Sequence, residues 1–196
     1  MKDYTKYSDL ELLALISEGA HSRDDAFKAV YVRYSAQVWG YCLYRSASRQ
    51  DAEELMQDAW LKFFAAACEG KRTERILPLL FTIARNLAID RFRKHEAKRN
   101  IKTDDFETCA LEQIPDPECV ENRVEREEFN NLVKVAINYL DDIYKEPMLL
   151  YWFGQLDYKE IAAVCKENEA CIRMRITRAY KKLADLLKPV LTERKG

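Results

Sequence analysis

The feature that most constrains the fold is the spacing of apolar residues, which recur at steps of three and four along most of the chain. Phe27, Val30, Tyr31, Tyr34 and Val38 are one example. This spacing gathers apolar side chains on one face of an α-helix. Only five glycines and five prolines occur among 196 residues, so the turn-rich pattern of an all-β protein is missing. With 48% hydrophobic residues the chain has enough material for packed cores, and we predict an all-α protein.

Local signals divide this pattern into helices. Ser8 is a plausible N-cap for a helix that carries Leu10, Leu13 and Ile16. Asp51 together with Glu54 resembles a capping box, which predicts a helix over residues 51–64. Further along the chain, Pro78 suits the first turn of a long helix that runs through Phe92. Gly154 is expected as the left-handed residue that ends a helix at 152–153. Leu132, Val135, Ala136 and Leu140 are expected on one buried face, and the tryptophans Trp39, Trp60 and Trp152 in the cores.

The charges are unevenly distributed, although the net charge is only −1. Residues 85–102 carry seven Lys and Arg, and residues 166–182 carry six. Between them, residues 103–128 carry ten acidic residues and two arginines, with two prolines and no helical periodicity. This pattern predicts two small helical domains that contact nucleic acid at two places, joined by an acidic linker. The N-terminal helical bundle would span residues 8–99, the linker 100–128, and a helix-turn-helix domain 129–190.

The segment from Leu156 to Leu187 predicts the helix-turn-helix. Asp157 can cap a short helix over residues 158–165, and Asn168 can cap the next one after a three-residue turn. The second helix would bury Ile172, Ile176, Ala179 and Leu183. Its other face presents Arg173, Met174, Thr177, Arg178 and Lys181. Such elements read the major groove of DNA, although an ordinary surface helix with a solvated basic face has the same pattern.

Several classes of function lack support in the sequence. The six cysteines form no CxxC pair, and neither histidine stands at a zinc-site spacing, so we expect free thiols and no metal site. A leader peptide and an apolar run long enough for a membrane span are absent, which predicts a soluble, cytoplasmic protein. A phosphate-binding glycine loop and a nucleophile–base pairing are also absent, so we expect neither an enzyme nor a cofactor.

Three segments, in order, resemble the extracytoplasmic-function (ECF) sigma factors of bacterial RNA polymerase. The run DAEELMQDAWLKFF from Asp51 resembles region 2.2 of the family, and LLFTIARNLAIDRFRK from Leu79 resembles regions 2.3 and 2.4. The segments LDYKEIAAV from Leu156 and IRMRITRAYKKL from Ile172 are similar to region 4.2. The resemblance covers residues 8–188, apart from the linker.

The resemblance implies that the chain directs core RNA polymerase to promoters and helps to melt them. The helix from Asp51 would dock on the clamp helices of the β′ subunit. The resemblance further implies contacts with the β subunit, and an anti-sigma factor as another partner. The candidate docking residues are Asp51, Glu53, Glu54, Gln57 and Asp58. Without the resemblance, the pattern of these residues favours a solvated acidic face.

The resemblance also implies two contacts with promoter DNA. The helix from Leu79 would meet the −10 element, where Asn86 and the connector at residues 68–75 would hold a flipped-out base, because an amide both donates and accepts along a base edge. The −10 candidates are Arg85, Asn86, Arg91, Arg93 and Lys94; Arg85 and Arg91 could instead pair with neighbouring acids. The −35 candidates are Arg173, Met174, Thr177 and Arg178 for base edges and Arg175, Lys181 and Lys182 for phosphates.

The chain departs from the family pattern at several positions. Leu79 stands where a tryptophan is usual, and Thr177 and Tyr180 replace commoner bulky or basic residues. Lys166 replaces a turn glycine and Glu167 an apolar residue; if residue 166 is left-handed, a lysine there is strained. A stand-alone helix-turn-helix regulator would explain the C-terminal half equally well, but it leaves the segment from Ile83 to Lys94 without a role. A protein adaptor that binds no DNA would leave both basic blocks unexplained.

Overall fold

The computed structural model describes residues 4–19, 22–70, 73–99, 133 and 135–193, and these fall into two compact units that divide between residues 111 and 112. No strand occurs within these ranges, so the prediction of an all-α fold is confirmed. The predicted linker at 100–128 lies outside the described residues, as do Cys109, Cys119, Phe129 and Leu132.

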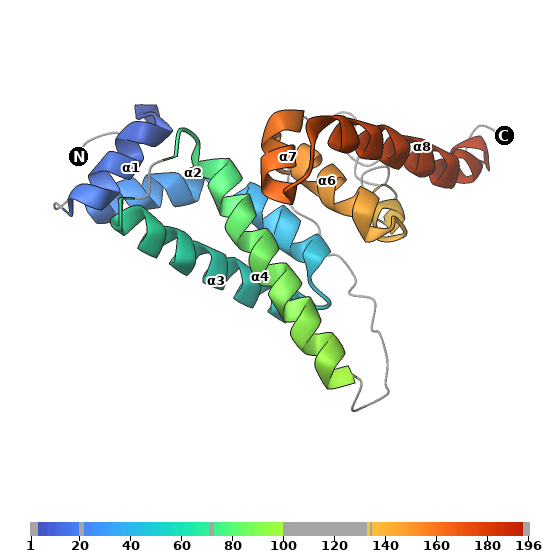
Figure 1. Ribbon diagram of the computed structural model, residues 1–196, viewed down its shortest axis with the longest axis horizontal. Coiled ribbons are helices and arrows are strands. Elements are labelled where there is room, and N and C mark those ends of the chain that lie inside the picture. Colours follow the sequence, from blue (N-terminus) through green and yellow to red (C-terminus); the bar gives the residue numbers. More distant parts are fainter. Residues whose placement is uncertain (1–3, 20–21, 71–72, 100–132, 134, 194–196) are drawn as a thin grey trace. The chain divides into compact units, whose positions relative to one another are not determined.

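The first unit begins with a short 3-10 helix, η1 (Tyr4–Lys6), followed by four α-helices (Figure 1). These are α1 (Asp9–Glu18), α2 (Arg23–Arg45), α3 (Arg49–Cys68) and α4 (Ile76–Arg99). Helix α2 contacts α1, α3 and α4, and α3 packs along α4. The core at their junction includes Leu12, Tyr41, Phe63 and Phe81, all of which are fully buried.

Caps that lie close in sequence set most of the helix starts in this unit. Ser8 accepts the backbone N–H of Glu11, whose carboxylate accepts the N–H of Ser8, so the predicted cap of α1 is confirmed as a full capping box. Helix α1 ends at Gly19 with φ of 74°, a left-handed conformation that glycine adopts without strain. Helix α3 starts two residues earlier than predicted. Ser48 is its N-cap and Asp51 is the third residue inside it, because a serine side chain can accept the N–H three residues on.

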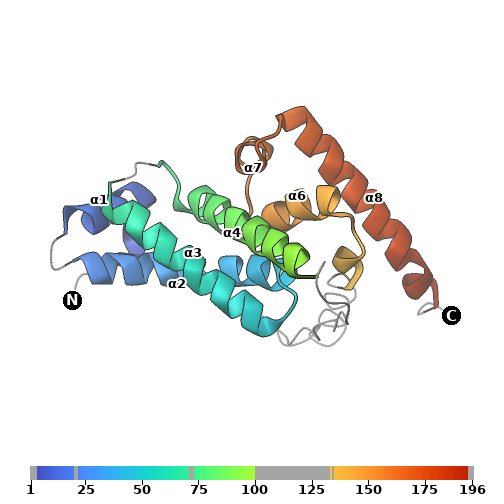
Figure 2. The same cartoon turned by 60° about the horizontal axis from the view of Figure 1, so that its bottom comes forward.

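The second unit contains α6 (Asp142–Trp152), α7 (Tyr158–Cys165) and α8 (Glu169–Glu193). Residues 133 and 135–138 are also helical. Helix α8 contacts both α6 and α7 (Figure 2). Met148, Ile161, Ile172 and Ala179 are fully buried at this junction.

Three local predictions were wrong in this unit. Gly154 is not left-handed; Gln155 carries the positive φ of 47°, because the chain turns one residue later. Val135 and Trp152 are about half-exposed, with exposed fractions of 52% and 42%. The buried stripe instead uses Val133, Ala136, Ile137 and Leu140, which keep the helical spacing. In the first unit, similarly, Leu10 is exposed and Leu12 occupies the core.

The cysteines in the described ranges are Cys42, Cys68, Cys165 and Cys171, and none of these four is in a disulfide. Burial raises the pKa of the Cys42 thiol to about 12, so this thiol stays neutral. Within the same ranges, no group of three His, Cys, Asp or Glu side chains is placed to hold a metal ion. None of the helices described is both long and apolar enough to cross a membrane.

Candidate nucleic-acid interface

Helices α7 and α8 form the predicted helix-turn-helix. Asp157 caps α7 through a full capping box with Glu160, and the carboxamide oxygen of Asn168 accepts the N–H of Cys171 at 2.7 Å, as expected. The turn between the helices begins at Lys166, which is left-handed with φ of 58° and ψ of 44°. A lysine in this conformation costs about 1 kcal/mol relative to glycine.

The outward face of α8 exposes three of the side chains that were predicted to read base edges, together with Lys181, which was predicted to bind phosphate. Met174, Thr177, Arg178 and Lys181 are exposed, while Ile172, Ile176, Ala179 and Leu183 on the opposite face are buried as expected. Arg178 and Lys181 form no ion pair with any other described residue. Both cations are therefore available to phosphates and base edges without first breaking such a contact.

The other three cationic −35 candidates on α8 have partners within their own unit. Arg173 lies 2.8 Å from a carboxylate oxygen of Glu169 and 4.7 Å from the centre of the Tyr158 ring. The departure at Glu167 supplies the partner of Arg175, at 3.1 Å. These contacts hold the two guanidinium groups against neighbouring residues of α7, the turn and the start of α8.

Lys182 reaches back to the start of α6. Its Nζ lies 2.8 Å from Asp141 and 4.8 Å from the centre of the Tyr144 ring. The hydrogen bond to Lys182 is the main cause that lowers the pKa of Asp141, and the same bond raises the pKa of Lys182. Lys182 has to give up this contact before it can bind a phosphate.

Helix α4 carries all five −10 candidates. Asn86, Arg93 and Lys94 are exposed, and Arg85 is half-buried. Arg91 differs from them, because its guanidinium donates to Asp58 at 2.6 Å, to Glu54 at 3.4 Å and to the backbone oxygen of Asp51 at 3.3 Å. The alternative that Arg91 pairs with acids is therefore what the structure shows, and the acids are on α3.

The candidate docking residues on α3 are divided by these contacts. Glu54 and Asp58 bind Arg91, and Glu53 pairs with Arg49 of the same helix at 3.1 Å. The Asp51 side chain accepts from Ser48 at the start of the helix. Gln57 is exposed and lines a groove of about 730 Å³ between α2 and α3.

This groove is mainly apolar and aromatic. Tyr31 and Leu61 at its walls have exposed fractions of 41% and 69%, and Trp60 is packed edge-on against Phe27 and Phe63. The residues that line it are Asp24, Phe27, Tyr31, Trp39, Glu53, Met56, Gln57, Trp60, Leu61 and Phe64. An exposed aromatic surface of this kind is characteristic of a protein-binding site.

Family models match both units. The model for sigma-70 region 2 matches residues 30–98, and the model for sigma-70 region 4 matches residues 131–183. Among curated proteins, the ECF RNA polymerase sigma factor SigM of Bacillus subtilis is 25% identical over 157 residues, which cover 80% of this chain and 92% of SigM. The RNA polymerase sigma-H factor of Pseudomonas aeruginosa is 24% identical, with 96% and 98% of the two chains covered.

The chain belongs to the ECF sigma factors.

Solved structures agree with the fold of this sigma factor. RpoE of Bartonella quintana, in complex with the anti-sigma factor NepR, has a TM-score of 0.66 at 23% identity and covers 83% of this chain and 96% of its own. CnrH, in complex with the cytosolic domain of CnrY, has a TM-score of 0.65 at 21% identity and covers 93% and 99%. ECF sigma factors direct RNA polymerase to promoters, and this is the function of the chain. A stand-alone regulator would not explain the match of residues 30–98 to region 2.

Sequence reasoning on this sigma factor missed the apolar groove, and it left open whether Arg91 binds DNA or pairs with an acid. The aromatic residues Phe27, Tyr31, Trp39 and Trp60 of the groove lining were predicted on an apolar helical face or in the cores, because a helical stripe of aromatic residues usually packs inside a bundle. The exposed Leu61, which stands beside the buried Trp60, was the available signal. The departure at Leu79 leaves a half-buried leucine on α4.

Proposed function

We propose that the functions of promoter binding and polymerase binding are divided among three surfaces of this sigma factor. The outward face of α8 reads the −35 element, the exposed residues of α4 hold the opened −10 element, and the α2–α3 groove docks the core polymerase. The observation that best supports this proposal concerns Arg178 and Lys181 on the recognition helix α8, which is capped by Asn168. Neither side chain forms an ion pair with any other described residue. The first unit acts as the region 2 domain (8–99), and the second as the region 4 domain (129–190).

The −35 assignment separates two kinds of contact on α8. Arg178 reaches base edges together with Met174 and Thr177, because all three are exposed on one side of the helix. Arg173 joins them, held in place by Tyr158. Lys181 binds phosphate, and Arg175 and Lys182 add phosphate contacts once they exchange a carboxylate for a phosphate.

In the −10 assignment, Asn86 is the residue that holds the flipped base. Its side chain is exposed on α4, one helical turn before Asp90. Arg93 and Lys94 bind phosphates of the opened strands, and Arg85 supports them. Arg91 serves mainly to hold α4 against α3.

The polymerase surface centres on the groove and Gln57. A pair of β′ clamp helices presents the amphipathic faces that such a groove accommodates. Glu53 adds a charge at the rim, whereas Glu54 and Asp58 shape the surface indirectly by binding Arg91. Contacts with the β subunit complete the holoenzyme.

Two further assignments follow from the family. An anti-sigma factor is proposed as the inhibitor of this chain, because RpoE and CnrH were both solved with such a partner or its cytosolic domain. We place the protein in the cytoplasm with RNA polymerase and assign it no catalytic activity of its own.

Run-off transcription tests the DNA assignments. Core polymerase with this chain should initiate specifically on one of its genomic promoters, and core polymerase alone should not. Asn86→Ala should initiate poorly on the duplex promoter and recover on a template whose −10 region is already melted, because base capture replaces lost pairing. Equal losses on both templates would exclude the flipped-base role.

Binding to core polymerase tests the groove. Leu61→Glu places a charge at the groove wall and should weaken the affinity for core at least about tenfold. Val32→Glu is the matched control, because Val32 is equally exposed, at 68% against 69%, and does not line the groove. Equal affinities of the two variants would show that core polymerase does not bind at the groove.

A further inference from the structure

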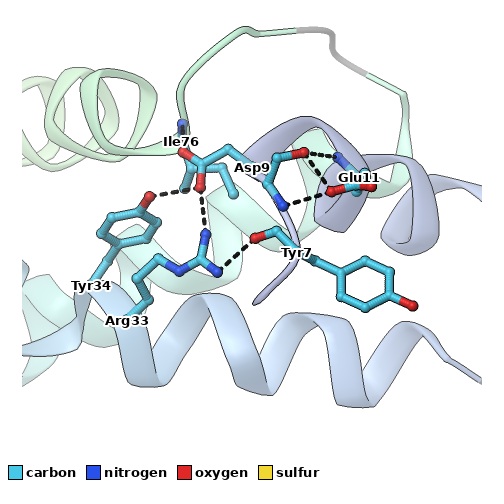
Figure 3. Close-up of polar contacts among 7 residues, drawn as sticks. Tyr7, Asp9, Glu11, Arg33, Tyr34 and Ile76 are labelled. Carbon is cyan, nitrogen blue, oxygen red and sulfur yellow. Dashed lines mark hydrogen bonds and ion pairs between the residues drawn. The ribbon is translucent and has the colours of Figure 1, made fainter. Parts of the chain in front are cut away.

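The carboxylate of Asp9 lies where three helices of the first unit meet (Figure 3). Its Oδ1 accepts hydrogen bonds from Arg33 at 2.9 Å and from the Tyr34 hydroxyl at 2.7 Å, both on α2. Its Oδ2 accepts the backbone N–H of Ile76 at 2.8 Å. The side chain is only 14% exposed, so these bonds are made largely out of contact with water.

Asp9 does not cap the helix to which it belongs. Ser8 and Glu11 form the capping box of α1, and Asp9 is the first residue inside that helix. Ile76 is the first residue of α4, and it is fully buried. The first N–H groups of a helix lack partners within it, and a buried N–H without a partner is costly. Asp9 thus caps α4 across 67 residues of sequence and places a negative charge at the positive end of its dipole.

Helix α2 holds the carboxylate in position. The Arg33 guanidinium donates to Asp9 with one nitrogen and to the backbone oxygen of Tyr7 with the other, at 2.7 Å. Burial, and secondly the bond to Asp9, raises the pKa of Tyr34 to about 12, so its hydroxyl remains a donor at neutral pH. Two donors from one helix therefore aim the second carboxylate oxygen at α4.

The capped residue stands at a sensitive place in the proposed function. Ile76 directly follows the connector at 68–75, and Asn86 lies ten residues further on the same helix, which is about 15 Å along its axis. Arg91 ties the distal half of α4 to α3. The cap at Ile76 and the Arg91 contacts add to the apolar packing that orients α4, and the cap also fixes where the connector ends.

We propose that Asp9 is a positioning residue for promoter opening. It fixes the junction between the connector and α4, and these two segments together hold the flipped base. The inference rests on the proposed role of α4 at the −10 element. Asp9 touches no DNA itself; it acts through Ile76.

The test compares four variants in the full-length protein assembled with core polymerase. Asp9→Ala removes the cap of α4. Ser8→Ala is the matched control at the neighbouring residue, because it removes the cap of α1 and leaves the cap of α4 in place. Tyr34→Phe removes one donor and leaves the bond to Ile76. Asn86→Ala is the reference for lost base capture. Open-complex formation is measured on a duplex promoter and on a pre-melted one, with core affinity and hydrogen exchange over residues 74–80 measured alongside.

We expect Asp9→Ala to slow opening of the duplex promoter about tenfold or more, the factor that corresponds to one lost charge-assisted hydrogen bond. The rate of opening should recover on the pre-melted template, and the affinity for core polymerase should be unchanged. The amide hydrogens at the start of α4 should exchange faster than in the parent. Ser8→Ala should leave opening and that exchange unchanged, and Tyr34→Phe should fall between the two.

Two results would overturn the inference. One is that Asp9→Ala opens the duplex promoter no more slowly than Ser8→Ala while Asn86→Ala remains defective, in which case the role of Asn86 stands and that of Asp9 fails. The other is an equal loss by Asp9→Ala on both templates, which shows general destabilisation. Failure of Asn86→Ala to affect opening would count against the proposed −10 site and is read separately.

Discussion

Helices α4 and α8 are both long and basic, and both carry predicted DNA contacts, but their charged side chains are held in different ways. Helix α4 is fixed by carboxylates of other helices: Asp9 of α1 at its start, and Asp58 and Glu54 of α3 at Arg91. On α8, Arg173 pairs with Glu169 in the same helix and Arg175 with Glu167 in the turn before it. Lys182 pairs with Asp141 at the start of α6.

The difference matches the two tasks proposed for these helices. A helix that holds an opened strand has to present Asn86 at one position against the cost of unpairing a base, so rigid anchoring of its backbone is useful. A recognition helix is positioned by its apolar face and its caps, and its exposed side chains can adjust to the base edges. Local partners such as Glu169 orient these side chains without restraining the backbone.

The largest effect is expected from removing the α3–α4 anchor. Arg91→Ala should destabilise the first unit by about 1.5–3 kcal/mol, because it leaves two carboxylates and a carbonyl without their donor. Arg173→Ala is the counterpart on α8 and should cost at most about 0.5 kcal/mol, since its ion pair is exposed. Urea denaturation followed by hydrogen exchange reports each unit separately; equal costs would remove the contrast between the helices.

The second prediction sharpens the comparison within α8. Arg178→Ala should lower the affinity for a matched promoter by about 1–3 kcal/mol and relax the preference at the contacted base. Lys181→Ala should weaken binding to all sequences alike and flatten the salt dependence, because it loses only a phosphate. A library of −35 sequences, measured at two salt concentrations, separates the two; identical profiles would contradict the assigned roles.

A smaller effect is expected at the turn of the helix-turn-helix. Lys166→Gly should stabilise the second unit by about 1 kcal/mol, because glycine adopts the left-handed conformation without strain. Lys166→Ala serves as the control, since it removes the same charge and keeps the Cβ. Thermal melting of both variants tests this prediction. An equal rise in melting temperature for both variants would show that the lost charge, and not the backbone conformation, causes the stabilisation.

The smallest effect concerns alkaline pH. The pKa of Tyr34 in the folded chain lies above its ordinary value of 10, so its contribution is complete below pH 10 and is lost as the pH rises towards 12. Tyr34→Phe should therefore show a shallower loss of stability over that interval than the parent. Denaturation at several alkaline pH values tests this; parallel curves would show that Tyr34 does not contribute.

Much of the fold could be predicted because the signals are short in range. The caps at Ser8, Asp157 and Asn168 join a side chain to an N–H three residues on, and the buried residues of α8 follow a 3.6-residue period. Errors arose where two local solutions compete. Ser48 replaced Asp51 as the cap of α3, and Gln155 took the conformation expected of Gly154.

The candidate site was predicted less completely. Exposure of Asn86, Met174, Thr177, Arg178 and Lys181 agrees with helical periodicity. The partners of Arg91 and Lys182 could not be predicted, because α3 and α6 are distant in sequence and several acids were equally available. The groove was missed because an aromatic stripe has the same period whether it is covered or left open.

By itself, the sequence determined the helices, the local caps at Ser8, Asp157 and Asn168, and the charged faces that α4 and α8 present, since each depends on residues within about four positions of one another. Only the tertiary structure decided which charges act between helices. Asp9 meets Ile76 across 67 residues and Arg91 meets Asp58 across 33, and both contacts require backbones brought together by the apolar core. A hydrogen bond forms only within about 3.2 Å and in good alignment, so packing selects one partner from many of equal chemistry.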